Sequence, residues 1–150
     1  MLRRALCLVW VAVLLVCLAS CGGGKTPLTA EAFATAVQEQ GYTVEMTTEG
    51  EEAYVLANNE GLSLSFAVST GEKEGMAWTL FANTVDAFEK AHPVRTMSLS
   101  SRSGNAEYYH ATGGEEFLII SRVDNTLLCC VSTPQHAKEL KALFEELGYK

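Results

Sequence analysis

The sequence predicts one α+β domain in which three helices pack on an antiparallel sheet, in the order α-β-β-β-α-β-β-β-β-α. Two groups of short segments alternate apolar with polar residues, as half-buried strands do. Turns rich in Gly, Asn and Asp separate the segments of each group, and strands joined by such short turns pair antiparallel. Three longer segments repeat apolar residues every three or four positions, which is typical of amphipathic helices that cover a sheet.

The first helix is predicted over residues 30–40. Thr29 precedes it as an N-cap residue, whose hydroxyl can accept a hydrogen bond from an unpaired N–H of the first turn. Leu28 and Phe33 occupy the two positions of a hydrophobic staple. Gly41 follows the last turn, where a residue in the left-handed conformation commonly ends a helix.

The strands are bounded by turn sequences, of which Gly113-Gly114 and Asp124-Asn125 are two-residue hairpin signals. Residues 117–120 are all apolar, so we expect this strand to be central, with both of its faces buried. The predicted strands cover residues 42–47, 53–57 and 62–69 in the first group, and 94–101, 106–112, 116–123 and 126–132 in the second.

The second helix is predicted over residues 76–91 and stops before Pro93. The last helix begins with Thr133 as its cap and Pro134 in its first turn, and it ends at Gly148. The apolar stripes of the two helices consist of Trp78, Phe81, Val85 and Phe88, and of Leu140, Leu143, Phe144 and Leu147.

The N-terminus has the parts of a secretory signal peptide in the expected order. Arg3 and Arg4 supply a positive segment, and residues 5–19 form an uninterrupted apolar run. A membrane-spanning helix needs about 20 apolar residues, so this run is short for a permanent span. The run ends in small residues and a cysteine.

The sequence Leu18-Ala19-Ser20-Cys21 resembles the lipobox of bacterial lipoproteins. The resemblance implies cleavage before Cys21 and a diacylglyceryl group on its sulfur, which would hold the mature protein at the extracytoplasmic face of the cell membrane. Two acyl chains attach a protein stably, whereas one binds only marginally. The alternative is an ordinary signal peptide cut after Ser20, with Cys21 as a chance thiol.

The predicted layout is a signal peptide over residues 1–20, a lipidated Cys21 with a Gly-rich tether over 21–27, and a single domain over 28–150. Without the signal peptide the chain keeps 9 Lys and Arg residues against 18 Asp and Glu residues. This acidic balance argues against nucleic acid as a partner, and against direct binding of anionic lipid by the protein surface.

Cys129 and Cys130 are the cysteines that follow Cys21 in the sequence. Adjacent residues of a strand point to opposite faces, so a disulfide between these two requires a distorted backbone. A redox or metal-binding pair is one interpretation. Two small apolar packing residues is the other, and we favour it because an unpaired cysteine often behaves as a small hydrophobe.

The sequence lacks the motifs of common catalytic and metal sites, and we predict no catalytic residue, cofactor or metal. His92, His110 and His136 have no sequence neighbours that complete a metal site, although Cys129, Cys130 and His136 could converge as a soft site. A Gly-x-Ser-x-Gly motif and a phosphate-binding glycine loop are both missing.

Clusters of polar residues have simple surface explanations. The serines at 98, 100, 101 and 103 fit the solvent face of an edge strand and its turn. The glutamates at 49, 51, 52, 115 and 116 fit solvated turns, because a calcium loop needs spaced carboxylates and a central glycine. Three tyrosines could present a sheet surface to a peptide or glycan, or could simply pack: Tyr54, Tyr108 and Tyr109.

Residues 28–149 resemble a set of small lipoproteins from Gram-positive bacteria. The resemblance rests on the opening Leu28-Thr29-Ala30-Glu31-Ala32-Phe33 with Gly41-Tyr42, on Ser121-Arg122-Val123-Asp124-Asn125-Thr126, and on the helix ending Leu147-Gly148-Tyr149. These motifs are caps and a hairpin, and they carry no activity to this chain.

We expect a non-enzymatic, lipid-anchored domain that binds a partner at the cell envelope. A small-ligand or metal receptor subunit is the second hypothesis, although the domain is too small for a two-lobed receptor. A small envelope hydrolase is the third, and it requires one of His92, His110 or His136 to meet a serine or an acid in space.

Overall fold

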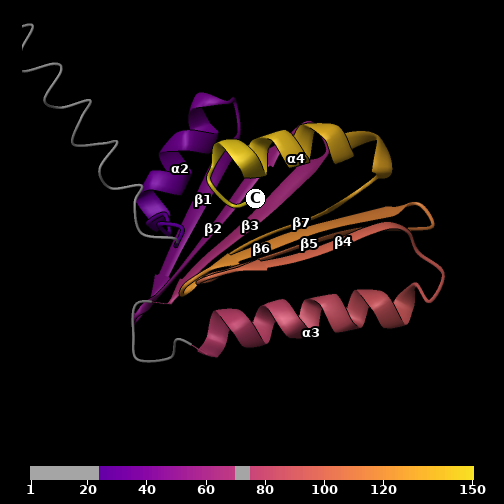
Figure 1. The fold of residues 1–150 in the computed structure, drawn as a ribbon. Helices are drawn as coiled ribbons and strands as arrows, with labels where there is room; N and C mark the ends of the chain where they lie inside the picture. Colours follow the sequence, from indigo (N-terminus) through magenta and orange to yellow (C-terminus); the bar gives the residue numbers. More distant parts are fainter. Residues whose placement is uncertain (1–23, 70–74) are drawn as a thin grey trace, which may run out of the picture.

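The computed structural model describes residues 24–69 and 75–150, which form one antiparallel sheet with helices on both faces (Figure 1). The predicted signal peptide and Cys21 lie outside the described residues. The elements are α2 (Ala30–Glu39), β1 (Thr43–Glu49), β2 (Glu52–Asn59), β3 (Leu62–Ser69), α3 (Gly75–Ala91), β4 (Thr96–Ser103), β5 (Ala106–Gly113), β6 (Glu116–Val123), β7 (Thr126–Ser132), a 3-10 turn (Pro134–His136) and α4 (Ala137–Glu146).

The seven strands lie in the order β1-β2-β3-β7-β6-β5-β4, and every neighbouring pair is antiparallel. Helices α2 and α4 lie on one face of the sheet and α3 lies on the other (Figure 1). The predicted α+β architecture and element order are therefore confirmed. The two strand groups join where β3 pairs with β7, with Leu64 opposite Cys130.

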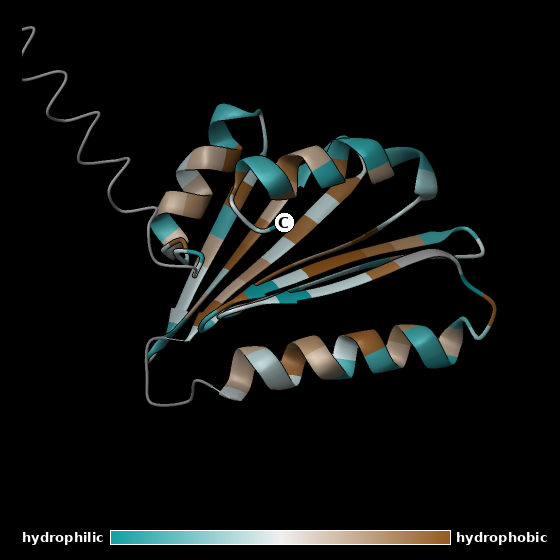
Figure 2. Ribbon diagram, in the orientation of Figure 1, coloured by the Kyte–Doolittle hydropathy of each residue, from teal (hydrophilic) through white to brown (hydrophobic). Residues whose placement is uncertain are grey.

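The larger core lies between the sheet and the helices α2 and α4. Phe66 of β3 is at its centre, with its ring centroid 4.4 Å from that of Phe33 in a stacked arrangement and 5.9 Å from that of Tyr149 in an edge-on arrangement. Each aromatic side chain that is fully buried in this way stabilises the fold by about 1.5–3 kcal/mol. In Figure 2 the hydrophobic bands on the strands mark this layer.

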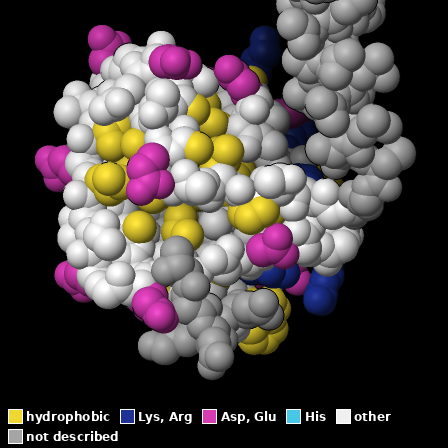
Figure 3. Space-filling view, turned by 90° about the vertical axis from the view of Figure 1, so that its left-hand side faces the viewer, with side chains coloured by type: hydrophobic (Ala, Val, Ile, Leu, Met, Phe, Trp, Pro, Cys, Tyr) yellow, Lys and Arg dark blue, Asp and Glu magenta, His cyan; other side chains and the backbone are white. Residues whose placement is uncertain are grey.

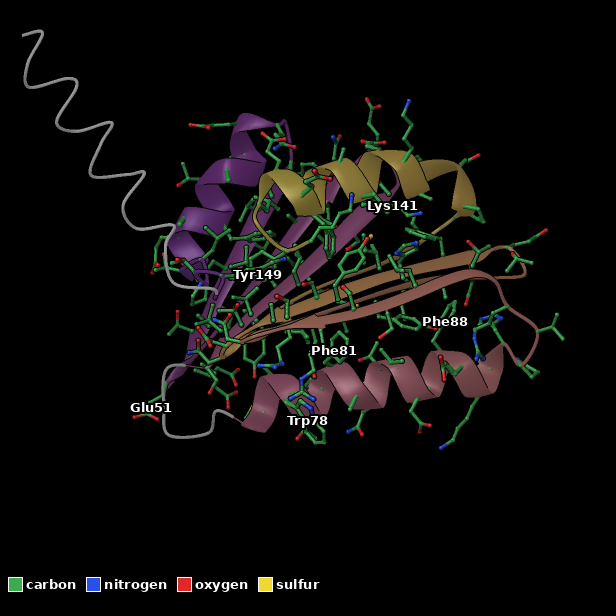
Figure 4. All side chains as sticks on the ribbon, in the orientation of Figure 1. Glu51, Trp78, Phe81, Phe88, Lys141 and Tyr149 are labelled. Atoms are coloured by element: carbon green, nitrogen blue, oxygen red, sulfur yellow. The ribbon has the colours of Figure 1, made fainter. Side chains whose placement is uncertain are left out.

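A smaller core lies beneath α3, where Phe81 and Phe88 stand between the helix and the sheet (Figure 4). Leu118 and Ile120 of β6 belong to this core, whereas Phe117 and Ile119 belong to the larger one. Strand β6 is thus buried on both faces inside the sheet, as its continuous apolar run predicts.

Helices α2 and α4 end in the same way. Gly41 and Gly148 follow their C-cap residues in the left-handed conformation, with φ of +87° and +79°. The N–H of the tyrosine after each glycine donates a hydrogen bond back to a carbonyl in the last helical turn. Both side chains, of Tyr42 and Tyr149, are buried in the larger core.

The two predicted N-caps have different outcomes. The Thr29 hydroxyl accepts a hydrogen bond from the Ala32 N–H at 3.1 Å, as predicted. The predicted cap at Thr133 is wrong, because its side chain makes no cap hydrogen bond to the described residues. Pro134–His136 instead forms a 3-10 turn in which the His136 N–H donates to the Thr133 carbonyl at 3.1 Å.

Two predicted boundaries shift for reasons that the contacts explain. The predicted strand at 94–101 starts later, at Thr96, because Arg95 turns back and donates hydrogen bonds from Nη1 to the carbonyls of Glu89 and His92 at 3.1 and 3.0 Å. The β5–β6 turn consists of Gly114 and Glu115 rather than the two glycines.

Gly113 remains in β5 because it pairs with Glu116, and it serves a different purpose from Gly114. A Cβ atom at Gly113 would stand 2.3 Å from Cγ of His92, so only glycine lets that imidazole lie against the strand. Gly114 supplies the turn, with φ of +60°.

Candidate functional site

The sheet face that carries α3 is only partly covered. The helix packs over β5, β6 and β7, and it also contacts β3, where Ala67 packs against the smaller core. The part of this face formed by β1, β2 and the adjoining side of β3 is largely exposed, and we call it the open half-face. It consists of Glu45, Thr47, Tyr54, Leu56, Ser65 and Ala67, of which Ala67 is half-buried at the border with α3. The register places these residues in two cross-strand rows, which are Glu45–Leu56–Ser65 and Thr47–Tyr54–Ala67.

The open half-face exposes large apolar side chains. Tyr54 and Leu56 of β2 are 39% and 38% exposed, although both lie in the interior of a strand that pairs on both sides. The first turns of α3 add exposed Trp78 and Leu80, and Leu80 lines a hollow together with Tyr54. Apolar side chains gathered on an exposed surface, and rimmed by polar ones, are typical of an interaction site.

Glutamates surround this apolar surface. Glu45 lines the open half-face, and Glu52 lines the hollow beside α3. The Tyr54 hydroxyl donates a hydrogen bond to the Glu52 carboxylate, which raises the Tyr54 pKa together with its partial burial and the negative charges of Glu52 and Glu49. Tyr54 is therefore held as a neutral phenol at this rim.

The negative charge near the open half-face can be recognised in the amino-acid sequence, although it was not among the features predicted above. Residues 26–72 contain eight glutamates and no Lys, Arg or His. This segment includes α2 and all three strands β1, β2 and β3. Figure 3 shows the side of the molecule that lies on the left in Figure 1, where exposed hydrophobic side chains lie among Asp and Glu side chains. Within this segment Glu45 and Glu49 lie on β1 and Glu52 lies on β2, so the strands of the open half-face carry acidic side chains and no basic one.

The covered end of the same sheet face is fastened by polar contacts. His92 Nε2 is 2.9 Å from a carboxylate oxygen of Glu116, and the His92 ring lies 4.5 Å from the ring of Phe88. The Tyr109 hydroxyl donates to Glu89 at 3.2 Å. These contacts join the C-terminal end of α3 to β5 and β6, so the helix is firmly held where it covers the sheet.

The predicted histidines do not converge. His92 and His136 each approach an acid, Glu116 at 2.9 Å and Glu139 at 3.5 Å, on different parts of the surface. His110 is buried in β5 on the sheet face that carries α4, close enough to sense the charge of Lys141 in that helix. Within the described part of the chain, no serine, threonine or cysteine side chain is hydrogen-bonded to any of the three.

His110 and Tyr108 are buried neighbours on β5, 7% and 3% exposed, with ring centroids 5.5 Å apart. His110 Nδ1 and the Tyr108 hydroxyl have no hydrogen-bond partner among the described residues. Burial, with the positive charges of Lys141 and Lys150, lowers the His110 pKa to about 4. Burial, with the charge of Glu145, raises the Tyr108 pKa to about 12. Both side chains are therefore neutral at pH 7.

The two cysteines project to opposite faces of β7, as strand geometry requires: Cys130 joins the larger core and Cys129 packs against the smaller one. Burial, with a contribution from Cys130, raises the Cys129 pKa to about 12. Burial raises the Cys130 pKa to about 11. Both remain protonated thiols at pH 7, whereas nucleophiles and metal ligands are thiolates.

The remaining predicted polar residues lie on the surface or in ion pairs. β4 is an edge strand, and its Ser100, Ser101 and Ser103 are exposed. The described residues contain no group of three or more His, Cys, Asp or Glu side chains placed to hold a metal ion. Among the same residues, no helix is long and apolar enough to cross a membrane.

Known proteins give no further guide to the site. No protein-family model, curated protein or solved structure matches this chain.

Proposed function

We propose that this chain is a non-enzymatic, lipid-anchored binding module of the cell envelope, and that the open half-face with the neighbouring edge strand β1 is its binding surface. The observation that carries the proposal is the exposure of Tyr54 and Leu56 on a strand in the interior of a sheet. A partner that covers these side chains would remove about 25 cal/mol of unfavourable hydration for each Å² of apolar surface buried.

The proposed anchor fixes how this surface meets the envelope. The Lys25 N–H donates to the Asn105 side chain at 2.9 Å, and Asn105 Nδ2 donates to the Lys25 carbonyl at 2.7 Å. Asn105 lies in the β4–β5 turn, at the same end of the sheet as the β1–β2 turn. A lipid on Cys21 would hold this end within roughly 14 Å of the bilayer, because four extended residues reach no further.

The anchor is tested by intact mass and detergent phase partitioning of the full chain made in a bacterial host. We expect a mass gain of one diacylglyceryl group and partitioning with the detergent, and both are lost in Cys21→Ala. Cleavage before residue 21 without a lipid would show a freely secreted protein and refute the anchor.

The binding surface is tested by site-specific photocrosslinking in cells of the native host. A photoreactive residue replaces Leu56, and a matched control replaces Lys138, an exposed residue of α4 on the opposite face of the sheet. We expect a discrete adduct at position 56 that disappears when Tyr54→Asp is added, and none at position 138. Equal crosslinking at both positions, or an adduct that Tyr54→Asp leaves unchanged, would refute the open half-face as the binding surface.

A further inference from the structure

We propose that β1 binds an extended, cationic segment of a partner protein, which adds to the sheet as an eighth strand and places Lys or Arg side chains opposite Glu45 and Glu49. The inference rests on the proposed binding function and adds the chemistry of the partner and the geometry of the complex.

Strand β1 is an open edge of the sheet. It pairs with β2 in an unbroken register from Thr43 opposite Asn58 to Glu49 opposite Glu52. In an antiparallel pair, alternate residues direct their N–H and C=O groups to the neighbouring strand, and the residues between them direct theirs outward. Glu49 and Glu52 close the two-residue turn and form a hydrogen-bonded pair. Thr48 therefore points its N–H and C=O away from β2, where an added strand would meet them.

The two edge strands of the sheet, β1 and β4, differ in how well they are protected against pairing with a strand of another chain. Natural edge strands are blocked by lysine, proline, bulges or inward-pointing charges. At the other edge, β4 has an irregular register between Thr96 and Leu99 and carries Arg102. β1 has a regular register, and its sequence contains neither proline nor a basic residue. β1 is thus the edge that an extended segment can join without rearrangement.

The side chains of β1 specify the chemistry of the added strand. Glu45 and Glu49 project from the sheet face that includes the open half-face, whereas Val44 and Met46 project from the face that carries α2. Met46 is 49% exposed, so an apolar residue of an added strand would cover it. Residues directly opposite one another across strands interact favourably when their charges are opposite or when both are apolar. A segment that alternates basic with apolar residues matches both faces of β1.

The same charges disfavour other occupants of this edge. If two copies of the chain paired through β1, the glutamates of one strand would face those of the other, and like charges directly opposite are destabilising. Anionic lipid headgroups would be repelled by Glu45 and Glu49, and residues 26–72 contain no basic residue that could attract them. A cationic polypeptide is the occupant that the charge favours.

The test measures binding of a fluorescent seven-residue peptide that alternates lysine with valine to the full chain, purified from its bacterial host in a non-ionic detergent. The matching peptide with glutamate in place of lysine is the control probe. Three variants are compared with the native chain: Glu45→Lys with Glu49→Lys, Thr48→Pro, and, as a charge-matched control, Glu115→Lys with Glu146→Lys. Thermal unfolding confirms that each variant is folded.

We expect the lysine peptide alone to bind, with an affinity that falls as salt is raised. Reversing both β1 charges weakens binding by about tenfold or more, because two attractive pairs become repulsive. Thr48→Pro has a similar effect because it removes an outward N–H while leaving the pairing with β2 intact. The control pair changes the affinity by less than about threefold, since it alters only the long-range field. Hydrogen exchange on the native chain shows slower exchange of the β1 amides with peptide present.

Several results would overturn the inference. Equal weakening by the β1 pair and the control pair would show non-specific attraction to net charge. Native affinity in Thr48→Pro, or unchanged β1 amide exchange, would exclude an added strand. Dimers in sedimentation that Thr48→Pro disperses would assign the edge to a second copy, and flotation with anionic vesicles after Cys21→Ala would assign it to lipid. Failure of the peptide to bind, while the crosslink at position 56 persists, would remove this inference and leave the proposed function standing.

Discussion

The stability of this fold should depend on pH through one buried histidine. His110 is 7% exposed on the sheet face that carries α4, with its ring 5.5 Å from that of Tyr108 and 5.9 Å from that of Phe117. Burial lowers its pKa from 6.5 to about 4, and the charges of Lys141 and Lys150 add to this effect. The informative perturbation is His110→Phe, which keeps an aromatic ring in this position and removes the titrating group.

The sign and size of the effect follow from proton linkage. As the pH falls below 6.5, the unfolded chain protonates this imidazole while the folded chain does not, until the pH approaches 4. The unfolded state binds more protons over this window, so the free energy of unfolding decreases as the pH is lowered. At 1.36 kcal/mol for each unit, the loss approaches about 3 kcal/mol near pH 4 and is nearly absent at pH 7.

The assay is urea unfolding of the native chain and of His110→Phe at a series of pH values from 7.5 to about 4. We expect the difference in unfolding free energy between the two proteins to shift by about 3 kcal/mol in favour of the variant as the pH falls through this window. Subtraction removes the contribution of the carboxylates, which titrate in both proteins. Parallel profiles would refute the reasoning, because they would show that His110 has the same pKa in the folded and unfolded states.

Three further predictions concern packing and charge. Gly113→Ala forces a Cβ atom to within 2.3 Å of His92 and should cost about 1–3 kcal/mol in urea unfolding. Adding His92→Ala should remove most of this cost, and an additive double mutant would contradict the contact. Phe66→Ala should lower the unfolding free energy by about 3–5 kcal/mol, and a loss below about 1 kcal/mol would mean that the core collapses around the cavity. Glu107, 8% exposed, lies 3.4 Å from Nε of Arg122. Glu107→Gln should lower the unfolding free energy, measured in denaturant, by about 3 kcal/mol, because the largely buried guanidinium of Arg122 loses its counter-charge. If high salt lowered the unfolding free energy of the native chain by as much, the Glu107–Arg122 pair would be screened by solvent and could not be the buried pair that the structure shows.

Local features of the fold were predictable from the sequence because short-range interactions determine them. Three features each depend on residues only a few positions apart in the sequence: the N-cap at Thr29, the glycines that end α2 and α4, and the Asp124-Asn125 turn. The displaced start of β4 could not be predicted in this way. It depends on Arg95, which bonds to carbonyls at the end of α3 instead of extending the strand.

The candidate site was harder to predict, because its exposure depends on which strands one helix covers. Tyr54 and Leu56 are exposed because α3 packs farther along the sheet, over β3, β5, β6 and β7. The hydropathy pattern of β2 cannot reveal which strands α3 covers. That depends on the pairing of β3 with β7, two strands that are far apart in the sequence. The glutamates of residues 26–72, and the absence of Lys, Arg and His among them, are visible in the sequence and indicate the half of the sheet in which the candidate site lies.

The pairing of β3 with β7 also constrains the order in which the chain can fold. Leu64 finds its partner, Cys130, only after β4, β5 and β6 have been made. A chain that emerges N-terminus first therefore presents β3 as a second unpaired edge, with Phe66 lacking part of its core, until the last strand arrives. Closing so long a loop is slow compared with forming a hairpin. During this interval the nascent first half, which carries eight glutamates, is kept apart from other copies by its own charge.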